Sequence, residues 1–412
     1  MCRTMLAAAV LLAAAGCGGS HTSSPRLTAM PAGALWDRPL TISISGLPAH
    51  TRAELRASAV RAGGYRYVST TTVQADGNGR VRLRGNAAMR VLWTMAPSDG
   101  ANAYEYQYQP AGLTARIRLA VVRGGATVAR TTVRRLVRAR GVRTTQLRPA
   151  QVGFYGELFT PADTSGRRPA VLLFGGSGGG LGSPEVAGLV ASHGYPTLDL
   201  AYFDEPGLPK NLFRVPLEYF ARALRWLAQQ PGVDPNRLVV EGGSRGSEAA
   251  QLLGIHYPSL VHAVVALVPS NGAVCGIRPW NGRRGASGGC LDGSAWSFHG
   301  REVPYATRGG PDTPHPFADE RIDGPLFLDC GGDDLLWPSC PMAHAIAARL
   351  RAHGFSHRVT LLAYPDGGHG VGWLFPYDPV RDVALMGATP TANQPIRARE
   401  WPRLLAFLRA LG

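Results

Sequence analysis

Lysine is almost absent from this chain of 412 residues, because Lys210 is the only one and arginine supplies nearly all of the 43 basic side chains. Acidic residues number 28, so the formal net charge is +15. Such an excess can indicate a nucleic-acid partner, but no zinc-finger or helix-turn-helix pattern accompanies it. A composition rich in arginine, alanine and glycine is also typical of a GC-rich genome. We therefore expect no nucleic-acid partner.

Long apolar runs are also missing, since no stretch beyond the N-terminus approaches the roughly 18 uninterrupted apolar residues of a membrane-spanning helix. The stretch Met5–Ala15 follows the basic Arg3 and is too short to span a bilayer, and small residues lead from it to Cys17. This pattern is typical of a secretory signal peptide. It resembles a bacterial lipoprotein signal, in which the cysteine, here Cys17, is lipidated after cleavage.

This interpretation sets the expected boundaries of the N-terminal region. Residues 1–16 should be removed as a signal peptide, and residues 17–34 should form a tether that is small and polar in Gly18–Pro25. One departure is Ala14, where leucine is commoner. The alternative is ordinary export, with Cys17 inside or beside the removed segment. We expect an exported cell-envelope lipoprotein that is held by its lipid anchor on the outer face of a bacterial membrane.

Cysteine is rare, with six residues in the chain, and four of them follow the N-terminal region. Disulfides can persist outside the cytosol, and four cysteines allow three pairings. We favour the local pairing, Cys275–Cys290 with Cys330–Cys340, which closes two short loops. No pair has the spacing of a zinc knuckle, so we expect no metal site, and we expect no cofactor.

Short alternating strands separated by glycine-rich turns dominate residues 35–148. Thr41–Ser45 and Arg116–Leu119, for example, alternate with a period of two. Strands at this spacing predict an immunoglobulin-like β-sandwich. Ten arginines fall between Arg116 and Arg148 without one acidic residue. We favour a solvated strand face over a site for an anionic surface or a phosphorylated substrate.

The pattern changes in residues 149–412, where buried-strand runs alternate with helical stretches. The runs cover 170–174, 197–201, 237–241, 262–268, 325–329 and 358–363. Alternation of this kind predicts a mostly parallel sheet flanked by helices. Ser270–Asp323 interrupts the rhythm with glycine, proline and tryptophan. We expect this insertion to be a lid or binding loop that shapes the pocket, or to be disordered.

The strongest chemical signal in the chain is Gly242-Gly243-Ser244-Arg245-Gly246. Leu238–Val240 predicts a strand that enters the motif and Glu248–Leu253 predicts a helix that leaves it, which is the strand-turn-helix of a nucleophile elbow. The glycines let the turn tighten and place the hydroxyl at the helix N-terminus. We therefore predict Ser244 as the nucleophile of an α/β-hydrolase that cleaves or transfers acyl groups. The alternative is a glycine-rich turn with an incidental serine.

A serine nucleophile needs a histidine base and an orienting carboxylate, in the order serine, acid, histidine. Asp333 and Asp334 follow the strand at 325–329, and His369 follows the last strand in a glycine-flanked loop. Open α/β sheets place their ligands at these carboxyl ends of strands. We predict His369 as the base and favour Asp334 over Asp333 as the acid, with Asp333 capping the following turn.

The oxyanion of the intermediate needs two backbone donors. One should be the N–H of Arg245, directly after the nucleophile. The second should come from Gly175–Gly180, the loop after a predicted strand, with the N–H of Ser177 preferred and that of Gly176 second. The loop has neither a Walker lysine nor Gly-x-Gly-x-x-Gly spacing, which excludes a phosphate cradle.

Six short segments match one known family when they are taken together. They are Leu35–Leu40, Gly46–Pro48, Leu92–Pro97, His193–Pro196, Leu200–Phe203 and Asp333–Trp337. The chain resembles the acyl-CoA thioesterase / bile acid-CoA:amino acid N-acyltransferase family over nearly all of its mature length. The resemblance implies an immunoglobulin-like domain before the hydrolase domain, and it places the family's triad on Ser244, Asp334 and His369. It implies cleavage of fatty or bile acyl-CoA, or acyl transfer to an amino acid.

We therefore expect a serine hydrolase that acts on a small-molecule acyl thioester or ester through an acyl-enzyme. A serine nucleophile rather than a cysteine favours hydrolysis over transfer to an amine. Acyl-CoA is a cytosolic metabolite, so an exported protein could act on another ester, thioester or lipid. The alternatives are a carboxylesterase of dienelactone-hydrolase type, an acyltransferase that acts on an envelope lipid, and a non-catalytic envelope binding protein.

Overall fold

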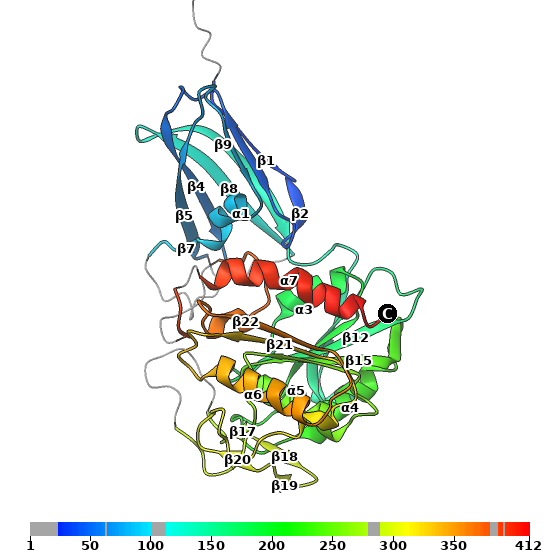
Figure 1. Cartoon of the computed structure of the whole chain (residues 1–412). Coiled ribbons are helices and arrows are strands. Elements are labelled where there is room, and N and C mark those ends of the chain that lie inside the picture. The colour runs from blue at the N-terminus through cyan, green and yellow to red at the C-terminus, as the bar shows by residue number, and fades with distance from the viewer. Residues whose placement is uncertain (1–23, 62–63, 100–112, 279–288, 380–385, 390–391) are drawn as a thin grey trace, which may run out of the picture.

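The computed structural model describes residues 24–61, 64–99, 113–278, 289–379, 386–389 and 392–412. Figure 1 shows a domain of β-strands at the top and a larger domain below it, in which helices surround a sheet. The predicted signal peptide and Cys17 lie outside the described residues. Within the described part of the chain, no helix is long and apolar enough to cross a membrane.

The N-terminal domain consists of two β-sheets around a shared core. Its strands are β1 (Arg26–Met30), β2 (Gly33–Leu35), β3 (Thr41–Ser45), β4 (Arg52–Val60), β5 (Arg66–Gln74), β6 (Val81–Arg84), β7 (Ala96–Pro97), β8 (Thr114–Arg123) and β9 (Ala126–Leu136). The order is β1-β3-β6 in one sheet and β2-β9-β8-β4-β5-β7 in the other. Alternate side chains are buried, such as Leu55, Ala57 and Ala59 of β4, because one face of each sheet covers the core. The predicted β-sandwich is confirmed.

Two details of this domain differ from the prediction. The expected tether, residues 17–34, already contains β1 and the start of β2, because Leu27 and Ala29 point into the core and β1 pairs with β3. The sandwich also holds a helix, α1 (Gly85–Trp93), where only strands were expected. A helix of nine residues has too few turns for its apolar period to stand out in the sequence.

The C-terminal domain is built around an eight-stranded sheet. Its strands, in spatial order, are β10 (Arg143–Leu147), β11 (Tyr155–Thr160), β13 (Thr197–Ala201), β12 (Arg168–Phe174), β15 (Val233–Gly243), β16 (Ala263–Leu267), β21 (Leu326–Gly331) and β22 (Val359–Tyr364). The strand β11 runs antiparallel to both of its neighbours, and the pairs from β13 to β22 are parallel. The predicted α/β-hydrolase fold is confirmed, and its sheet begins at Arg143 rather than at residue 149.

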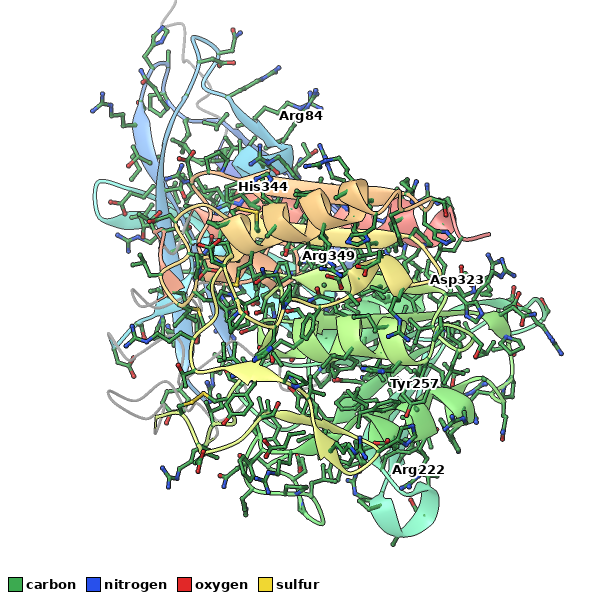
Figure 2. The ribbon with its side chains drawn as sticks, turned by 60° about the horizontal axis from the view of Figure 1, so that its bottom comes forward. Arg84, Arg222, Tyr257, Asp323, His344 and Arg349 are labelled. Atoms are coloured by element: carbon green, nitrogen blue, oxygen red, sulfur yellow. A yellow bond between two sulfur atoms is a disulfide. The ribbon has the colours of Figure 1, made fainter. Side chains whose placement is uncertain are left out.

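Helices cover both faces of this sheet. They are α2 (Pro149–Val152), α3 (Pro184–Ser192), α4 (Leu217–Leu227), α5 (Arg245–His256), α6 (Ser339–Ala352) and α7 (Asn393–Arg409), with the short 3-10 helices η1 (Asp319–Arg321) and η2 (His369–Gly372). Side chains of α3 and α7 join the core on one face, and those of α4, α5 and α6 join the core on the other. Arg349 of α6, labelled in Figure 2, lies 2.6 Å from Glu320 of η1.

The described part of the Ser270–Asp323 insertion is packed against the hydrolase domain. It contributes the short strands β17 (Ala273–Val274), β18 (Trp296–Phe298), β19 (Arg301–Glu302) and β20 (Tyr305–Ala306), and β18 pairs with β14 (Val215–Pro216). Trp296 is fully buried, with its ring centroid 6.1 Å from that of Phe220 in α4. The insertion is therefore anchored by an aromatic side chain in the core.

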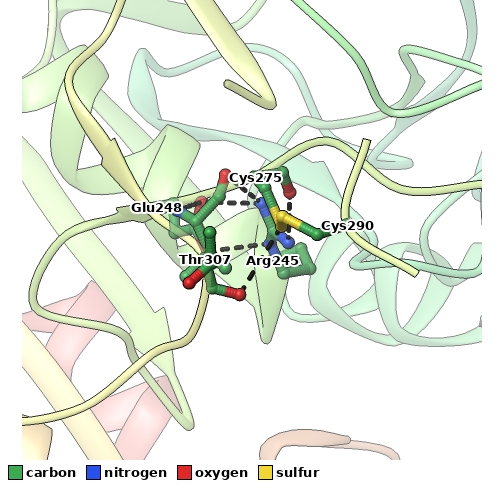
Figure 3. Close-up of a disulfide and its surroundings, with 6 residues drawn as sticks. Arg245, Glu248, Cys275, Cys290 and Thr307 are labelled. Carbon is green, nitrogen blue, oxygen red and sulfur yellow. Dashed lines mark hydrogen bonds and ion pairs between the residues drawn. A yellow bond between two sulfur atoms is a disulfide. The ribbon is translucent and has the colours of Figure 1, made fainter. Parts of the chain in front are cut away.

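Two disulfides lie in the hydrolase domain. Cys275–Cys290 closes a loop at the start of the insertion (Figure 3), and Cys330–Cys340 links the end of β21 to α6. The structure thus brings together the two pairs that the sequence favours.

A partly buried polar cluster joins the two domains. Asp37 of the sandwich lies 2.6 Å from Nε2 of His193 and accepts a hydrogen bond from Nε1 of Trp401 at 3.0 Å. Burial raises the pKa of Asp37, but the hydrogen bonds from His193 and Trp401 and the charges of His193 and Arg38 together leave this pKa below its ordinary value. Nearby, Trp93 stacks on Tyr377, and one hydrophobic core runs through both domains.

Candidate active site

Ser244 follows β15 directly, in a strained turn that leads into α5. Its φ is 55° and its ψ is −124°, a conformation that residues other than glycine rarely adopt. The flanking glycines lie against other backbone atoms. A Cβ on Gly242 would be 2.3 Å from the carbonyl oxygen of Gly246, and one on Gly246 would be 2.4 Å from that of Gly175. Glycine is therefore required at both ends of the elbow.

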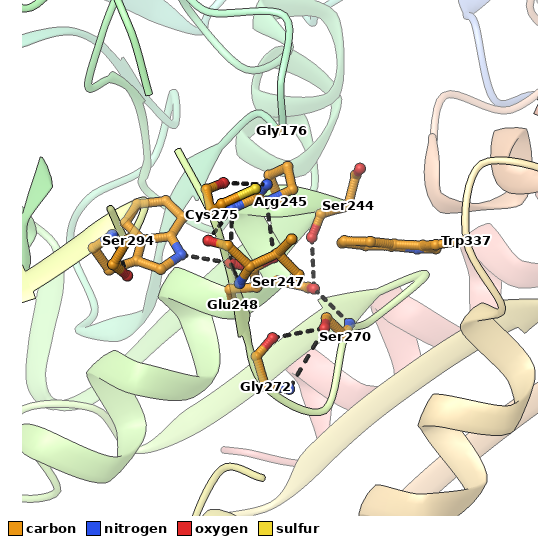
Figure 4. Close-up of polar contacts among 12 residues, drawn as sticks. Gly176, Ser244, Arg245, Ser247, Glu248, Ser270, Gly272, Cys275, Ser294 and Trp337 are labelled. Atoms are coloured by element: carbon orange, nitrogen blue, oxygen red, sulfur yellow. Dashed lines mark hydrogen bonds and ion pairs between the residues drawn. The ribbon is translucent and has the colours of Figure 1, made fainter. Parts of the chain in front are cut away.

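Hydrogen bonds hold the elbow from the sheet and from the first turn of α5. The N–H of Ser244 donates to the carbonyl of Leu267 at 2.9 Å, and Oγ of Ser247 donates to the carbonyl of Ser244 at 2.6 Å (Figure 4). The N–H of Ser270 donates in turn to Oγ of Ser247 at 3.3 Å. The backbone of Ser244 is thus held on both sides.

His369 begins η2, directly after the loop that follows β22. Its Nδ1 lies 2.8 Å from Oδ2 of Asp334. The other carboxylate oxygen, Oδ1, accepts from the N–H groups of Leu336 at 3.0 Å and Trp337 at 3.3 Å. In the tautomer that carries the proton on Nδ1, Nε2 of His369 is the basic atom. A carboxylate held at both oxygens can fix this ring in one orientation.

Asp333 faces a different partner. Its Oδ2 accepts from the N–H of Ala388 at 2.7 Å, and its own N–H donates to the carbonyl of Gly367 at 2.9 Å. The expectation that Asp333 caps the following turn is wrong, because Oδ1 of Asp334 accepts from that turn. The geometry therefore selects Asp334 as the partner of His369.

Trp337 was not among the predicted site residues. Its Nε1 donates to the carbonyl of Val268 at 3.1 Å, and its ring lies edge-on to His369 with 5.8 Å between the ring centroids. The indole therefore forms a wall beside the imidazole. The sequence feature that could have indicated Trp337 is its position in Asp333–Trp337, one of the segments that resemble the family.

Tyr202, also missed, orients the loop that was expected to supply the second oxyanion donor. Its hydroxyl lies 2.8 Å from the carbonyl oxygen of Gly175 and 2.9 Å from that of Gly176. Because the N–H of a trans peptide points opposite to its C=O, the N–H groups of Gly176 and Ser177 face away from Tyr202. Gly176 also touches the elbow, since a Cβ there would lie 3.0 Å from Cβ of Ser244.

Ser244 and His369 line one cavity of about 490 Å³, together with Gly176 and Ser177. Arg61 of the sandwich reaches the same cavity, so both domains contribute to it. No described residue of the 270–323 insertion lines the cavity. The expectation that the insertion shapes the pocket is therefore wrong for its described part, because buried Trp296 and the pairing of β18 with β14 hold it elsewhere.

Three buried carboxyl groups lie near this site. Glu241, in β15, lines the cavity, and burial raises its pKa to about 8, with a further contribution from the charge of Asp329. The other two are Asp329 of β21 and Glu400 of α7. Burial raises the pKa of Glu400, and its interaction with Asp329 raises it further. Protonation of such groups limits the negative charge that accumulates around His369.

The sheet order and the elbow define the class of the protein as an α/β-hydrolase. Two family models match the chain. The one described as "Acyl-CoA thioester hydrolase/BAAT N-terminal region" matches residues 37–149, and the one described as "BAAT / Acyl-CoA thioester hydrolase C terminal" matches residues 215–278 and 300–394. Between them the matches cover more than half of the chain and fall on both domains. The chain belongs to the acyl-CoA thioester hydrolase/BAAT family, and it is a hydrolase of acyl esters or thioesters.

Similarity to individual proteins extends over most of the chain. It is 28% identical to "Peroxisomal succinyl-coenzyme A thioesterase" of Mus musculus, with 90% of this chain and 93% of that relative covered. It is 27% identical to "Acyl-coenzyme A thioesterase 2, mitochondrial" of Homo sapiens, with 92% and 82% covered. A solved α/β hydrolase from a Medee basin deep-sea metagenome library is 19% identical with a TM-score of 0.43, covering 66% of this chain and 99% of that one.

Proposed function

We propose that this chain cleaves acyl thioesters of the acyl-CoA type through a triad of Ser244, His369 and Asp334. The observation that carries the proposal is the 2.8 Å contact between Nδ1 of His369 and Oδ2 of Asp334, at the wall of the cavity that also contains Ser244. The thioesterase relatives support a thiol as the leaving group.

In the proposed reaction, Nε2 of His369 takes the hydroxyl proton of Ser244 while Asp334 holds Nδ1–H. Oγ of Ser244 adds to the acyl carbonyl carbon, and the N–H groups of Arg245 and Ser177 stabilise the oxyanion. Collapse of the intermediate breaks the carbon–sulfur bond, and the thiol leaves with the proton from His369. A water activated by His369 then attacks the acyl-enzyme, and the carboxylic acid is released.

A direct test compares acyl-CoA thioesters with oxygen esters of the same acyl chains, using the mature protein. We expect a higher kcat/KM for the thioesters. A higher kcat/KM for the oxygen esters would instead identify a carboxylesterase.

Replacement of the nucleophile provides the second test. We expect Ser244→Ala to lower kcat by about 10⁴-fold or more in a protein that is still folded by circular dichroism. A fluorophosphonate probe should label Ser244 in the wild type. Turnover by Ser244→Ala at the wild-type rate would exclude this triad.

We also propose that the mature protein is exported and lipidated at Cys17. The proposal rests on the apolar segment and the small residues before that cysteine. Mass spectrometry of the mature N-terminus should find residues 1–16 removed and a lipid on Cys17, and Cys17→Ala should release the protein from the membrane fraction. An unmodified N-terminus at another residue would overturn the proposal.

A further inference from the structure

The side chain of Arg245 is buried beneath the elbow rather than placed along the cavity. Arg245 is the first residue of α5 and directly follows Ser244. Its Nη1 donates to the carbonyl of Cys275 at 3.0 Å, and its Nη2 donates to the carbonyl of Val274 at 2.8 Å (Figures 3 and 4). A planar guanidinium that binds several acceptors at once can move little, and so it restrains its own backbone.

Glu248, one turn further along α5, balances the charge of this arginine. Its Oε1 lies 2.8 Å from Nε of Arg245, and its Oε2 accepts from Nη2 of Arg245 at 3.2 Å. The same Oε2 accepts from Nε1 of Trp296 at 2.6 Å. Burial raises the pKa of Glu248, and the charge of Arg245 opposes that shift. Because desolvation offsets most of the attraction in a buried ion pair, this pair is weak evidence for a gain in stability.

We call the guanidinium of Arg245, together with Glu248 and the carbonyls of Val274 and Cys275, the clamp. The clamp lies next to the peptide whose N–H serves as an oxyanion donor in the proposed reaction. The amide nitrogen of Arg245 and its buried side chain are bonded to the same Cα. The residue before it, Ser244, has a φ of 55°. A strained turn of this kind persists only where the surrounding structure holds it. Movement of a catalytic group by about 1 Å can lower the rate by about 10²-fold.

Cys275 connects the clamp to a disulfide. Its carbonyl accepts from Arg245, its N–H donates to the carbonyl of Ala306 at 3.0 Å, and its sulfur is bonded to Cys290. Cys275 is buried whereas Cys290 is exposed. The disulfide therefore ties a buried acceptor of the clamp to the surface.

We propose that Arg245 is a positioning residue whose guanidinium, held by Glu248 and by the carbonyls of Val274 and Cys275, fixes the oxyanion donor, and that the Cys275–Cys290 disulfide anchors this clamp. The described part of the insertion thus supports the elbow from beneath. The inference rests on the proposed function of Ser244.

The test measures kcat and KM for Arg245→Met, Glu248→Gln, Arg245→Lys and Cys290→Ser in the mature protein. We expect Arg245→Met to lower kcat by about 10²-fold with little change in KM. Arg245→Lys should recover part of that loss, and Glu248→Gln and Cys290→Ser should lower kcat in the same direction by less. If Arg245→Met does not fold, the milder variants Glu248→Gln and Cys290→Ser still decide the test.

Arg349→Met is the matched control. Arg349 binds Glu320 through two bonds of 2.6 and 2.7 Å and also ties a helix to the insertion, but it is not among the residues that line the cavity. It should lower the melting temperature without lowering kcat. An equal loss of kcat in Arg349→Met would overturn the proposal, because the effect would then be general destabilisation.

The rate of fluorophosphonate labelling separates the hypothesis that Ser244 is the nucleophile from the hypothesis that Arg245 positions the oxyanion donor. A wild type that is not labelled at Ser244 would defeat the proposed function itself. If the wild type is labelled and folded Arg245 and Glu248 variants react and turn over at its rate, the clamp is refuted while the nucleophile stands. Wild-type kcat in Cys290→Ser would remove the disulfide from the clamp.

Discussion

Asp333 and Asp334 are consecutive, yet their carboxylates bind different segments: Oδ2 of Asp334 lies 2.8 Å from Nδ1 of His369, whereas Oδ2 of Asp333 accepts from the N–H of Ala388 at 2.7 Å. Asp334→Asn should lower kcat by about 10⁴-fold, because an amide cannot stabilise the imidazolium and favours the wrong tautomer. Asp333→Asn should lower kcat far less. Both are measured with one acyl ester, and a larger loss in Asp333→Asn would contradict the assignment.

Gly176 and Gly178 form a second matched pair. A Cβ at 176 would lie 2.9 Å from the carbonyl oxygen of Gly243 and 3.0 Å from Cβ of Ser244, whereas one at 178 would meet no atom within 4 Å. Gly176→Ala should push the loop from the elbow and lower kcat by about 10² to 10³-fold, the cost of one lost oxyanion donor. The kcat of Gly178→Ala should stay near that of the wild type. Both variants are measured by steady-state kinetics, and equal losses of kcat would contradict this prediction.

The hydroxyl of Tyr202 should matter for catalysis. Tyr202→Phe leaves the carbonyls of Gly175 and Gly176 without this donor, so we expect kcat to fall and the free energy of unfolding to drop by about 1–3 kcal/mol. Tyr219→Phe is the control, because its hydroxyl also donates to a carbonyl, that of Ala201 at 2.6 Å. We expect urea melts to show destabilisation of both variants and kinetics to show a lower kcat for Tyr202→Phe alone.

Glu241 should make stability depend on pH. Its pKa rises from an ordinary 4.5 to about 8 on folding, chiefly because it is buried. The folded protein therefore binds this proton more tightly than the unfolded chain, and its stabilising contribution is complete below about pH 4.5 and is lost as the pH rises through about 8. Glu241→Gln has no proton to lose, so its melting temperature should fall less steeply from about pH 5 to 8 than that of the wild type. Parallel slopes would show that another group is responsible.

Much of the hydrolase fold could be predicted because each buried strand forms a short apolar run. The strand at 170–174, for example, became β12 with one extension toward Arg168. The start of the sandwich and the helix α1 could not be predicted in the same way. Strand β1 is recognisable only by its pairing with β3, and α1 by the core that its apolar side chains cover.

The tight, glycine-flanked turn at Ser244 could be read from the amino-acid sequence alone. Glycines at 242 and 246 around Ser244, between a strand and a helix, meet a local backbone requirement that can be read along the chain. The choice between Asp333 and Asp334 as the partner of His369 depended on the fold. The fold also decided that Arg245 points toward Cys275 and that the insertion lies beneath the elbow. Those contacts join segments that are far apart in the chain, so they depend on how the folded elements pack and not on any local pattern.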